Sequence, residues 1–199
     1  GELKRGPLPD TQAMGAVISV INRKVNAAAR TKHMRGMGTT LTAAVIVGKK
    51  LLVAHVGDSR LYLARGRRFS QVTSDHTMTQ NRVEAGLITE EEAATDQYRH
   101  VLTRAIGGES DVSADVRVLD LRAGDRILIC SDGLHGLVGD REIASCLRGG
   151  SPDLVAQSLV DLANQAGGTD NITAVVARIK AVRSRPASAP ERCYRTADR

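Results

Sequence analysis

The sequence predicts an α+β fold in which two mainly antiparallel sheets form a sandwich flanked by helices. Two observations support this prediction. Pairs of short strand-like segments are joined by tight, glycine-containing turns, and the helical segments do not alternate regularly with the strands. Strands joined by hairpins pair antiparallel, whereas a parallel sheet needs a long crossover between its strands. The helices are therefore expected on the outer faces of the sheets.

The first part of the chain contains one long helix followed by strands. In residues 10–30, apolar residues recur at steps of three and four, which is typical of an amphipathic helix. Glycines 36 and 38 then end the helical pattern. Two hairpins are expected next, each with β-branched and aliphatic strands on either side of a glycine turn: 39–47 with 51–56, and 59–64 with 68–72.

The second part mixes short helices with strands. Thr89, followed three residues later by Glu92, predicts a capping box, and Gly86 separates this helix from the one before it. The sequence Ser-Pro-Asp at 151–153 supplies an N-cap, a first-turn proline and an acid for a later helix. The expected helices are 77–84, 89–94, 140–147 and 151–165, and the expected strands are 114–120, 125–130 and 171–179.

The composition is that of one globular domain with an aliphatic core. The chain has 199 residues, of which 42% are hydrophobic and only 2% aromatic. No stretch approaches the roughly 20 apolar residues of a membrane span, and no signal-peptide segment opens the chain. Three cysteines at scattered spacings argue against a disulfide framework and against a zinc site. We therefore expect a cytoplasmic protein.

The basic excess lies at the two ends of the chain. The net charge is +6, yet residues 36–180 hold sixteen basic against eighteen acidic residues. Because this body is nearly neutral and has few aromatic side chains for base stacking, no nucleic acid partner is expected. Residues 1–180 are expected to form the domain. Residues 181–199, rich in Arg, Pro, Ser and Ala without periodicity, are expected to form a disordered basic tail.

Three aspartates stand near glycine at the ends of apolar strands. Asp58 and Asp132 follow the strands ending at residues 56 and 130, and Asp170 precedes the last strand. Each one taken alone is more typical of a turn residue that hydrogen-bonds to its own backbone. Together they indicate a metal site, because converging carboxylates repel each other unless a cation lies between them. Oxygen ligands favour Mg²⁺ or Mn²⁺.

The histidines offer weaker candidates. His76 follows Ser74 and Asp75 at an expected helix start, where one of these two residues would act as N-cap. His55 lies inside an apolar strand and is typical of a core histidine whose polar atoms are hydrogen-bonded. No Ser-His-Asp or Cys-His arrangement can be proposed from the spacing, so the sequence contains no credible nucleophile.

Six short motifs follow one another along the chain: Gly36-Met-Gly-Thr-Thr40, Val56-Gly-Asp-Ser-Arg60, Thr73-Ser-Asp-His76, Val101-Leu-Thr-Arg-Ala-Ile-Gly107, Cys130-Ser-Asp-Gly-Leu134 and Gly168-Thr-Asp-Asn-Ile-Thr173. In this order they resemble the motifs of the metal-dependent Ser/Thr protein phosphatases of type 2C, bacterial branch. The resemblance covers residues 10–180, and the stretch 84–92 is similar to the mobile flap of the bacterial enzymes.

The resemblance implies an αββα sandwich that hydrolyses phosphoserine and phosphothreonine in proteins with a metal-activated water. Asp132 and Asp170 would be ligands of a two-metal centre, and Asp58 with Asp132 would contribute to a third metal position. The implied cofactor is Mn²⁺ or Mg²⁺, as two or three ions. The implied partners are phosphorylated protein substrates and Ser/Thr kinases, and the chain is expected to be a monomer.

The sequence also departs from the family pattern. Family members carry an upstream segment with a phosphate-gripping Arg, an Asn-Glu-Asp motif and an Asp-Gly-x-Gly motif, and none of these occurs before Gly36. We therefore expect residues 1–180 to be a type 2C domain that is incomplete at its N-terminus and lacks its first strands. The alternative is a non-catalytic phosphatase-like module that binds or regulates.

Overall fold

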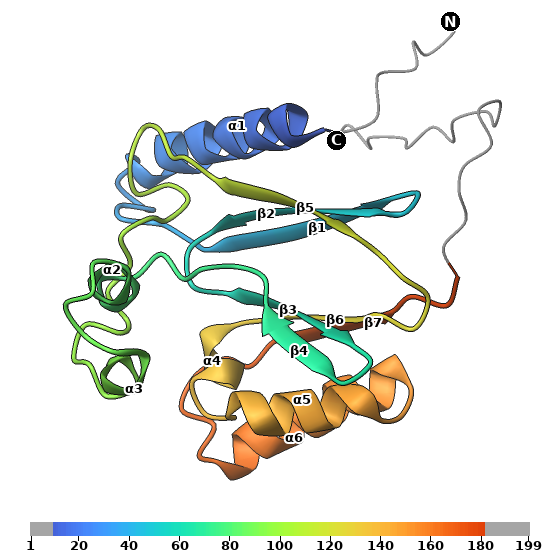
Figure 1. Cartoon of the computed structure of the whole chain (residues 1–199). Helices are drawn as coiled ribbons and strands as arrows, with labels where there is room; N and C mark the ends of the chain where they lie inside the picture. Colours follow the sequence, from blue (N-terminus) through green and yellow to red (C-terminus); the bar gives the residue numbers. More distant parts are fainter. Residues whose placement is uncertain (1–9, 182–199) are drawn as a thin grey trace, which may run out of the picture.

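The computed structural model describes residues 10–181, and the predicted sandwich is confirmed. Within these residues, strands form two antiparallel sheets that pack face to face (Figure 1). The first sheet has the order β1-β2-β5, formed by β1 (Leu41–Val47), β2 (Lys50–Val56) and β5 (Asp115–Asp120). The second has the order β4-β3-β6-β7, formed by β3 (Arg60–Arg65), β4 (Arg68–Gln71), β6 (Arg126–Cys130) and β7 (Ala174–Arg178).

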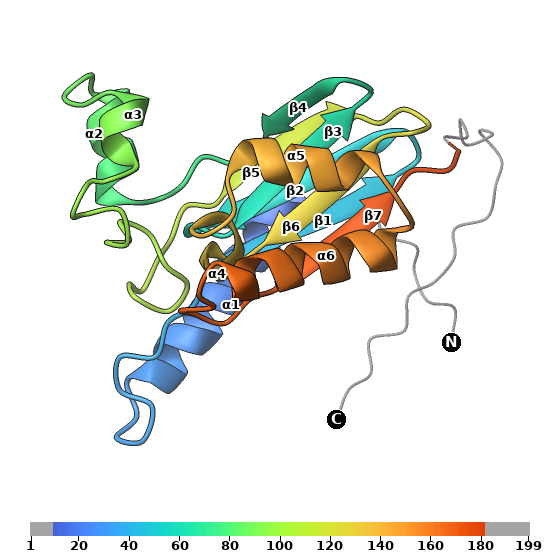
Figure 2. The same cartoon turned by 90° about the horizontal axis from the view of Figure 1, so that it is seen from below.

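Helices cover both outer faces of the sandwich, which gives the αββα arrangement. The first sheet is covered by α1 (Thr11–Ala29), and the second by α5 (Asp140–Arg148) and α6 (Pro152–Gln165), as Figures 1 and 2 show. The short α4 (Asp132–His135) directly follows β6. The helices α2 (Met78–Glu84) and α3 (Glu90–Ala93) lie beside the sandwich rather than on it.

The core consists of three apolar layers, as the pattern of alternating faces predicts. The layer between α1 and the first sheet includes Met14, Ile18, Leu52, Ala54, Val56 and Ile106. The layer between the two sheets includes Leu51, Val53, Leu61, Leu63, Val72 and Ile127. The layer under α5 and α6 includes Tyr62, Leu128, Ile143, Leu147 and Leu159. The core is thus almost wholly aliphatic, as expected from the 2% aromatic content.

The helix ends follow the expected local chemistry. The side chain of Asp10 accepts a hydrogen bond from Ala13 N at 2.8 Å and caps α1. Thr89 and Glu92 form the predicted capping box of α3. The Ser151 side chain caps α6, with Pro152 in its first turn. Each cap satisfies backbone N–H groups that have no partner within the helix.

Two differences from the expected elements have local causes. The last strand begins at Ala174 rather than at residue 171, because the backbone of residues 171 and 173 is bonded to Ser131 instead of to a neighbouring strand. The helix α4, only four residues long, carries no hydrophobic period by which it could be recognised. The expected tail falls almost wholly on residues 182–199, which lie outside the described part of the chain.

Strands that are consecutive in the sequence do not always share a sheet. The chain passes from the first sheet to the second between β2 and β3, and again between β5 and β6. The first crossing takes only residues 57–59. Gly57 makes this possible: its φ is +109°, and a Cβ atom there would lie 2.5 Å from Cγ2 of Thr40. The backbone of Gly57 also exchanges two hydrogen bonds with His76, from His76 N to Gly57 O at 2.8 Å and from Gly57 N to His76 Nδ1 at 3.1 Å.

Further polar groups of the crossing are bonded to the first sheet, to the residue just before it and to α4. Thr42 of β1 donates its hydroxyl to Ser59 O at 2.8 Å, and the hydroxyls of Thr40 and Ser59 lie 2.8 Å apart. On the other side, Nε2 of His135 lies 3.0 Å from Asp58 O. The crossing is therefore fixed at every residue.

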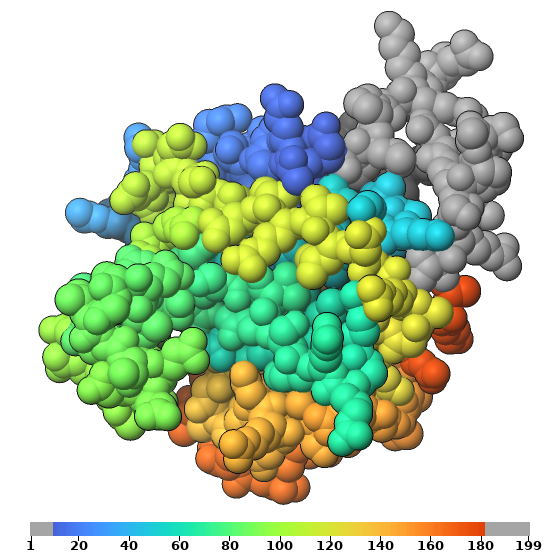
Figure 3. Space-filling model, in the orientation of Figure 1, coloured from blue at the N-terminus to red at the C-terminus, as the bar shows by residue number. Residues whose placement is uncertain are grey.

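Residues 78–101 form an insertion beside the sandwich whose two ends are bonded together. Thr77 and Leu102 form an isolated antiparallel bridge. Met78 N donates to Val101 O at 2.9 Å, and Thr103 N donates to His76 O at 2.8 Å. In Figure 3 the insertion is the green lobe at the left edge of the molecule. It contains α2, α3 and the stretch similar to a flap.

We expect Gly57→Ala to destabilise the protein more than Gly48→Ala does. Both glycines have positive φ, +109° and +59°, but nothing lies within 4 Å of a Cβ at Gly48. Gly48→Ala is expected to cost about 1–2 kcal/mol of unfolding free energy from backbone strain. Gly57→Ala is expected to cost about 1–3 kcal/mol more, because the new methyl group collides with Thr40. Urea unfolding of both variants measures the difference, and equal losses would contradict the role of this contact.

Candidate metal centre

The three predicted aspartates lie at the same end of the two sheets. Asp58 lies in the crossing from β2 to β3, Asp132 is the first residue of α4 after β6, and Asp170 lies in the loop between α6 and β7. In Figure 1 the crossing from β2 to β3 and the helix α4 lie at the left end of the sandwich. The antiparallel topology brings these positions together. The crossing leads from the end of β2 to the start of β3, which pairs with the end of β6, and the end of β6 pairs with the start of β7.

The loops that carry Asp132 and Asp170 are tied together. Ser131 N donates to Thr173 O at 3.1 Å, and Thr173 N donates to the Ser131 side chain at 3.0 Å. The Ser131 hydroxyl in turn donates to Asn171 O at 3.0 Å. Gly133 lies so close to this loop that a Cβ there would overlap the carbonyl oxygen of Asn171. Glycine at position 133 is thus required for the two carboxylate-bearing loops to approach each other.

Asp58 is the most buried of the three, with 9% of its surface exposed. Burial, followed by the nearby negative charge of Asp132, raises the pKa of the Asp58 carboxyl above its ordinary value. The two carboxylates therefore repel each other in this structure. A divalent cation would relieve this repulsion and hold both groups ionised.

The donor chemistry fits Mg²⁺ or Mn²⁺, since all three candidates are carboxylate oxygens. Their number is small for such an ion. Within residues 10–181, no three or more carboxylate, imidazole or thiol side chains lie close enough together to hold an ion by themselves. Asp132 and Asp170 are also engaged locally, because each accepts a hydrogen bond from the backbone N–H of the following residue, at 3.0 Å and 2.6 Å. The carboxylates of the described residues therefore do not by themselves complete a ligand set for such an ion.

An ion-pair network that the sequence analysis did not identify supports this end of the sandwich. Arg60, at the start of β3, contacts both carboxylate oxygens of Asp75, through Nε at 3.0 Å and Nη2 at 2.8 Å. Its Nη1 donates to the Tyr62 hydroxyl at 3.0 Å, which donates to Asp140 of α5 at 3.1 Å. We refer to this two-pronged ion pair as the Arg60–Asp75 fork. Such a pair fixes the relative orientation of the two side chains as well as their distance. The network joins β3, α5 and the segment that precedes α2.

The expectation that Ser74 or Asp75 caps the helix at 77 is wrong. Thr77 is the N-cap of α2, and its side chain accepts a hydrogen bond from Gln80 N at 3.1 Å. Asp75 is instead used by Arg60, and Gln71 also donates to it at 3.0 Å. A threonine two residues after the acid was the sequence signal for the true cap.

His55 and His76 form a buried pair between the crossing and the insertion. Their ring centroids are 4.7 Å apart, and each residue is at most 2% exposed. The Thr42 hydroxyl, 2.9 Å from Nδ1 of His55, already donates to Ser59 O, so Nδ1 of His55 carries a proton. Its Nε2 has no hydrogen-bond partner, so the expectation of a fully satisfied core histidine holds for one nitrogen only.

The second ring of the pair has the opposite tautomer. Nδ1 of His76 accepts from Gly57 N, so its proton lies on Nε2. That atom is 3.3 Å from Oδ2 of Asp115, but without the angle of a hydrogen bond. Asp115 is held in turn by Arg104 at 2.7 Å. Burial lowers the pKa of both histidines, in His55 to about 4, with the charge of His76 as the second cause.

The fold and the site together define a class of proteins, namely αββα sandwiches with carboxylates at one end of their two sheets. The chain belongs to the protein phosphatase 2C family, whose pattern matches residues 10–172. It is 40% identical over 153 residues to a putative protein phosphatase 2C-type of Streptococcus pyogenes, a match that covers 76% of this chain and 62% of the relative. The chain thus spans less than two thirds of that relative's length.

Solved structures of the family share the fold. The crystal structure of the Mycobacterium tuberculosis serine/threonine phosphatase PstP/Ppp superposes with a TM-score of 0.81 at 38% identity, over 85% of this chain and 72% of that one. The catalytic domain of PstP in complex with two manganese ions gives a TM-score of 0.79 at 37% identity, over 88% and 74% of the two chains. Separately, no helix within residues 10–181 is both long and apolar enough to cross a membrane.

We expect the stability of the protein to fall as the pH is lowered from about 6.5 towards 4, in part because of His55. Its folded-state pKa, about 4, lies below the unfolded value of 6.5, so the unfolded chain takes up the proton first. Above the pKa that His55 has in the unfolded chain, the neutral side chain contributes its full stabilisation. About 3 kcal/mol of this stabilisation is lost once the pH has fallen below the pKa that His55 has in the folded protein.

The matched variants for this pH dependence are His55→Asn and His33→Asn. An asparagine at 55 can still donate to Thr42 but does not titrate, whereas His33 is exposed in the loop after α1. Urea unfolding between pH 7 and pH 4 should show a weaker pH dependence for His55→Asn only. The same pH dependence in both variants would assign the effect to other groups.

Proposed function

We propose that this chain supplies part of the catalytic centre of a metal-dependent phosphatase that hydrolyses phosphoserine and phosphothreonine in proteins. The observation that supports this most directly is the position of Asp58, Asp132 and Asp170 at one end of the sandwich, where burial and then the nearby charge of Asp132 raise the pKa of Asp58. Membership of the protein phosphatase 2C family supports the same reaction class.

In this proposal, Asp132 and Asp170 hold a pair of Mn²⁺ or Mg²⁺ ions, and Asp58 with Asp132 contributes to a third position. The structure of PstP with two manganese ions supports the cofactor. When bound, such ions lower the pKa of a water and draw charge from the phosphate oxygens. The residues of this chain orient the ligands: Gly133 brings the two loops together, and the Gly57–Ser59 crossing holds Asp58 in place.

The remaining ligands are proposed to come from outside the described residues. Three features support this proposal. The carboxylates within residues 10–181 do not complete a ligand set, the upstream family motifs do not occur before Gly36, and the chain covers 62% of its streptococcal relative. The proposed partners are phosphorylated proteins and the Ser/Thr kinases that produce them, and the proposed setting is the cytoplasm.

We expect Asp132→Asn to weaken Mn²⁺ binding more than Asp58→Asn does, because Asp132 is shared between two of the proposed metal positions. Calorimetric titration of the 199-residue chain with Mn²⁺ measures both affinities. Asp120→Asn is the control, since Asp120 lies at the other end of the first sheet and its carboxylate pairs with Lys50. Unchanged, equal affinities in all variants would remove the metal assignment.

We expect residues 1–199 alone to show no metal-dependent hydrolysis of a phosphothreonine peptide above background. Uncatalysed phosphate monoester hydrolysis is among the slowest reactions known, and a partial ligand set cannot hold two metal ions the roughly 4 Å apart that two-metal catalysis uses. The chain extended upstream to include the missing motifs should hydrolyse the peptide in Mn²⁺, and Asp170→Ala should abolish this activity.

Two results would contradict the proposal that this chain supplies only part of the metal ligands of a catalytic centre. Turnover of about 1 s⁻¹ or more by the 199-residue chain would mean that a group described here as structural replaces the missing ligands. An extended chain that folds and binds Mn²⁺ but never hydrolyses the peptide would favour the alternative of a binding or regulatory module.

A further inference from the structure

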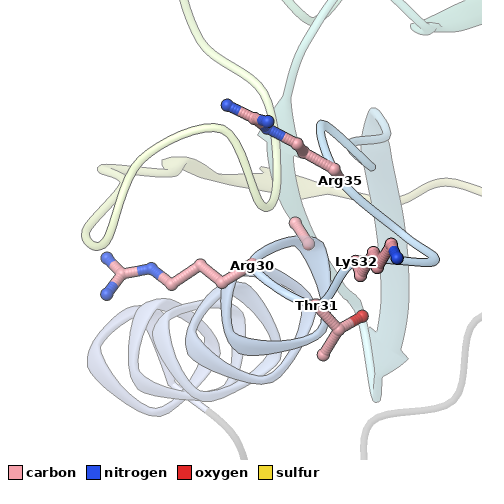
Figure 4. Close-up of a pocket in the computed structure, with 5 residues that line it drawn as sticks. Arg30, Thr31, Lys32 and Arg35 are labelled. Atoms are coloured by element: carbon pink, nitrogen blue, oxygen red, sulfur yellow. The ribbon is translucent and has the colours of Figure 1, made fainter.

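The C-terminal end of α1 and the loop after it carry a cluster of cations around a surface pocket. The pocket has a volume of about 640 Å³ and is lined by Arg30, Lys32 and Arg35, together with Ala29 and Thr31. We refer to the three cations as the α1-end cluster. Figure 4 shows that the Arg30 and Arg35 side chains leave the helix end and the loop in different directions, while Lys32 lies on the far side of the loop.

Within residues 10–181, these cations form no ion pair with an acidic side chain. The sequence contains no acidic residue between Asp10 and Asp58. Among the ion pairs within residues 10–181, none involves a member of the α1-end cluster. All three side chains are exposed. Many other exposed cations of the described residues also lack an ion pair, so the feature that sets this cluster apart is the gathering of three of them around one pocket, where an external anion can bind.

The backbone that carries the cluster is held in a series of turns. The Thr31 hydroxyl donates to Ala28 O at 2.8 Å, and Gly36 N donates to Ala29 O at 3.3 Å. Gly36 has a φ of +78°, which reverses the chain towards β1. The positions of the three residues are therefore defined by backbone hydrogen bonds, although their long side chains extend into solvent.

The cluster lies at the same end of the sandwich as the proposed metal centre. The loop leads directly to Thr39, which pairs with Ile106, and to Thr40, whose hydroxyl is 2.8 Å from that of Ser59, next to Asp58. Figures 1 and 2 both place the C-terminal end of α1 at this end of the molecule, and in Figure 3 the light-blue loop protrudes on the same side as the green insertion.

The geometry determines which kind of anion fits. A helix C-terminus presents backbone carbonyls and the negative end of the helix dipole, so a single small anion gains nothing from the backbone there. Three separate, diverging cations instead match several negative charges spaced along an extended chain. An extended polypeptide with several acidic side chains can present a charge to each of the three cations, because its side chains recur every ~3.3 Å and point alternately to opposite sides of the backbone.

We infer that the α1-end cluster binds acidic side chains that flank the phosphorylated residue of a protein substrate. This inference rests on the proposed function, because it assigns a substrate class to the same centre. The cluster then favours phosphopeptides with neighbouring Glu or Asp residues over neutral or basic ones. Its contribution is electrostatic, so it acts mainly on KM and weakens as salt is added.

The first experiment measures binding without catalysis. A fluorescein-labelled phosphothreonine peptide with Glu on both sides is titrated with the 199-residue chain at low salt, and anisotropy is recorded. The triple variant Arg30→Gln, Lys32→Gln, Arg35→Gln should bind about tenfold more weakly, since each exposed ion pair contributes little and three add up. The matched control is Lys49→Gln, Arg67→Gln, Arg68→Gln, at the turns of the opposite end, and should bind like the unmodified chain.

The second experiment uses the upstream-extended chain and two phosphothreonine peptides, one with acidic flanks and one with neutral flanks. We expect an approximately tenfold preference in kcat/KM for the acidic peptide, carried by KM, and loss of this preference in the α1-end triple variant. Hydrolysis of the neutral peptide should not change. The thermal midpoint of the triple variant shows whether the fold is intact, because cations at a helix C-terminus also stabilise the helix.

The outcomes separate this inference from the proposed function. Cluster-dependent peptide binding by an extended chain that never hydrolyses the peptide would support the docking site and contradict the proposed function. Hydrolysis without any preference, or equal binding by both triple variants, would overturn the docking site alone. Tighter, cluster-dependent binding of a single-stranded oligonucleotide than of the acidic peptide would overturn the assigned ligand class.

Discussion

The structure depends on how the chain passes from one sheet to the other between β2 and β3. Three residues make this passage, and each is bonded to a different neighbour: Gly57 to His76, Asp58 to His135, and Ser59 to Thr42. Because the two sheets share no strand, this passage fixes their relative position at the end where the carboxylates lie. Moving it would displace Asp58, the buried histidine pair and the root of the insertion together.

The Arg60–Asp75 fork extends the same constraint outward. Arg60 immediately follows the crossing, and Asp75 immediately precedes His76, so the fork clamps the two segments that the Gly57–His76 hydrogen bonds join. Charged groups at this depth are stable only when both are paired and hydrogen-bonded, as they are here. The carboxylates proposed to bind metal are in the opposite condition, since the Asp58 and Asp132 charges oppose each other. One end of the sandwich thus combines the Arg60–Asp75 ion pair, which stabilises the local structure, with two neighbouring carboxylates whose repulsion a cation would relieve.

Much of the fold follows from local sequence, whereas the partition into two sheets does not. The strands, the capping box at Thr89 and the helix begun by Ser151 were predictable, because periodicity and caps are properties of neighbouring residues. The placement of β5 and β6 in different sheets was not predictable, because the turn between two strands does not determine which other strands they pair with. The aspartates at strand ends were expected to come together, and the structure places all three at one end of the sandwich. The fork from Arg60 to Asp75 and the two tautomers at His55 and His76 depend on contacts between segments that no sequence period records.

The insertion of residues 78–101 begins and ends at the same point of the sandwich, where Thr77 is bridged to Leu102. Closing a loop costs conformational entropy, but this cost grows only with the logarithm of the number of residues in the loop. Lengthening the insertion therefore adds little to the free-energy cost of folding the domain. Its length and sequence can therefore change over evolutionary time while the strands on either side keep their register. This makes the segment a locally closed unit of the domain, whose length does not set the register of the strands on either side.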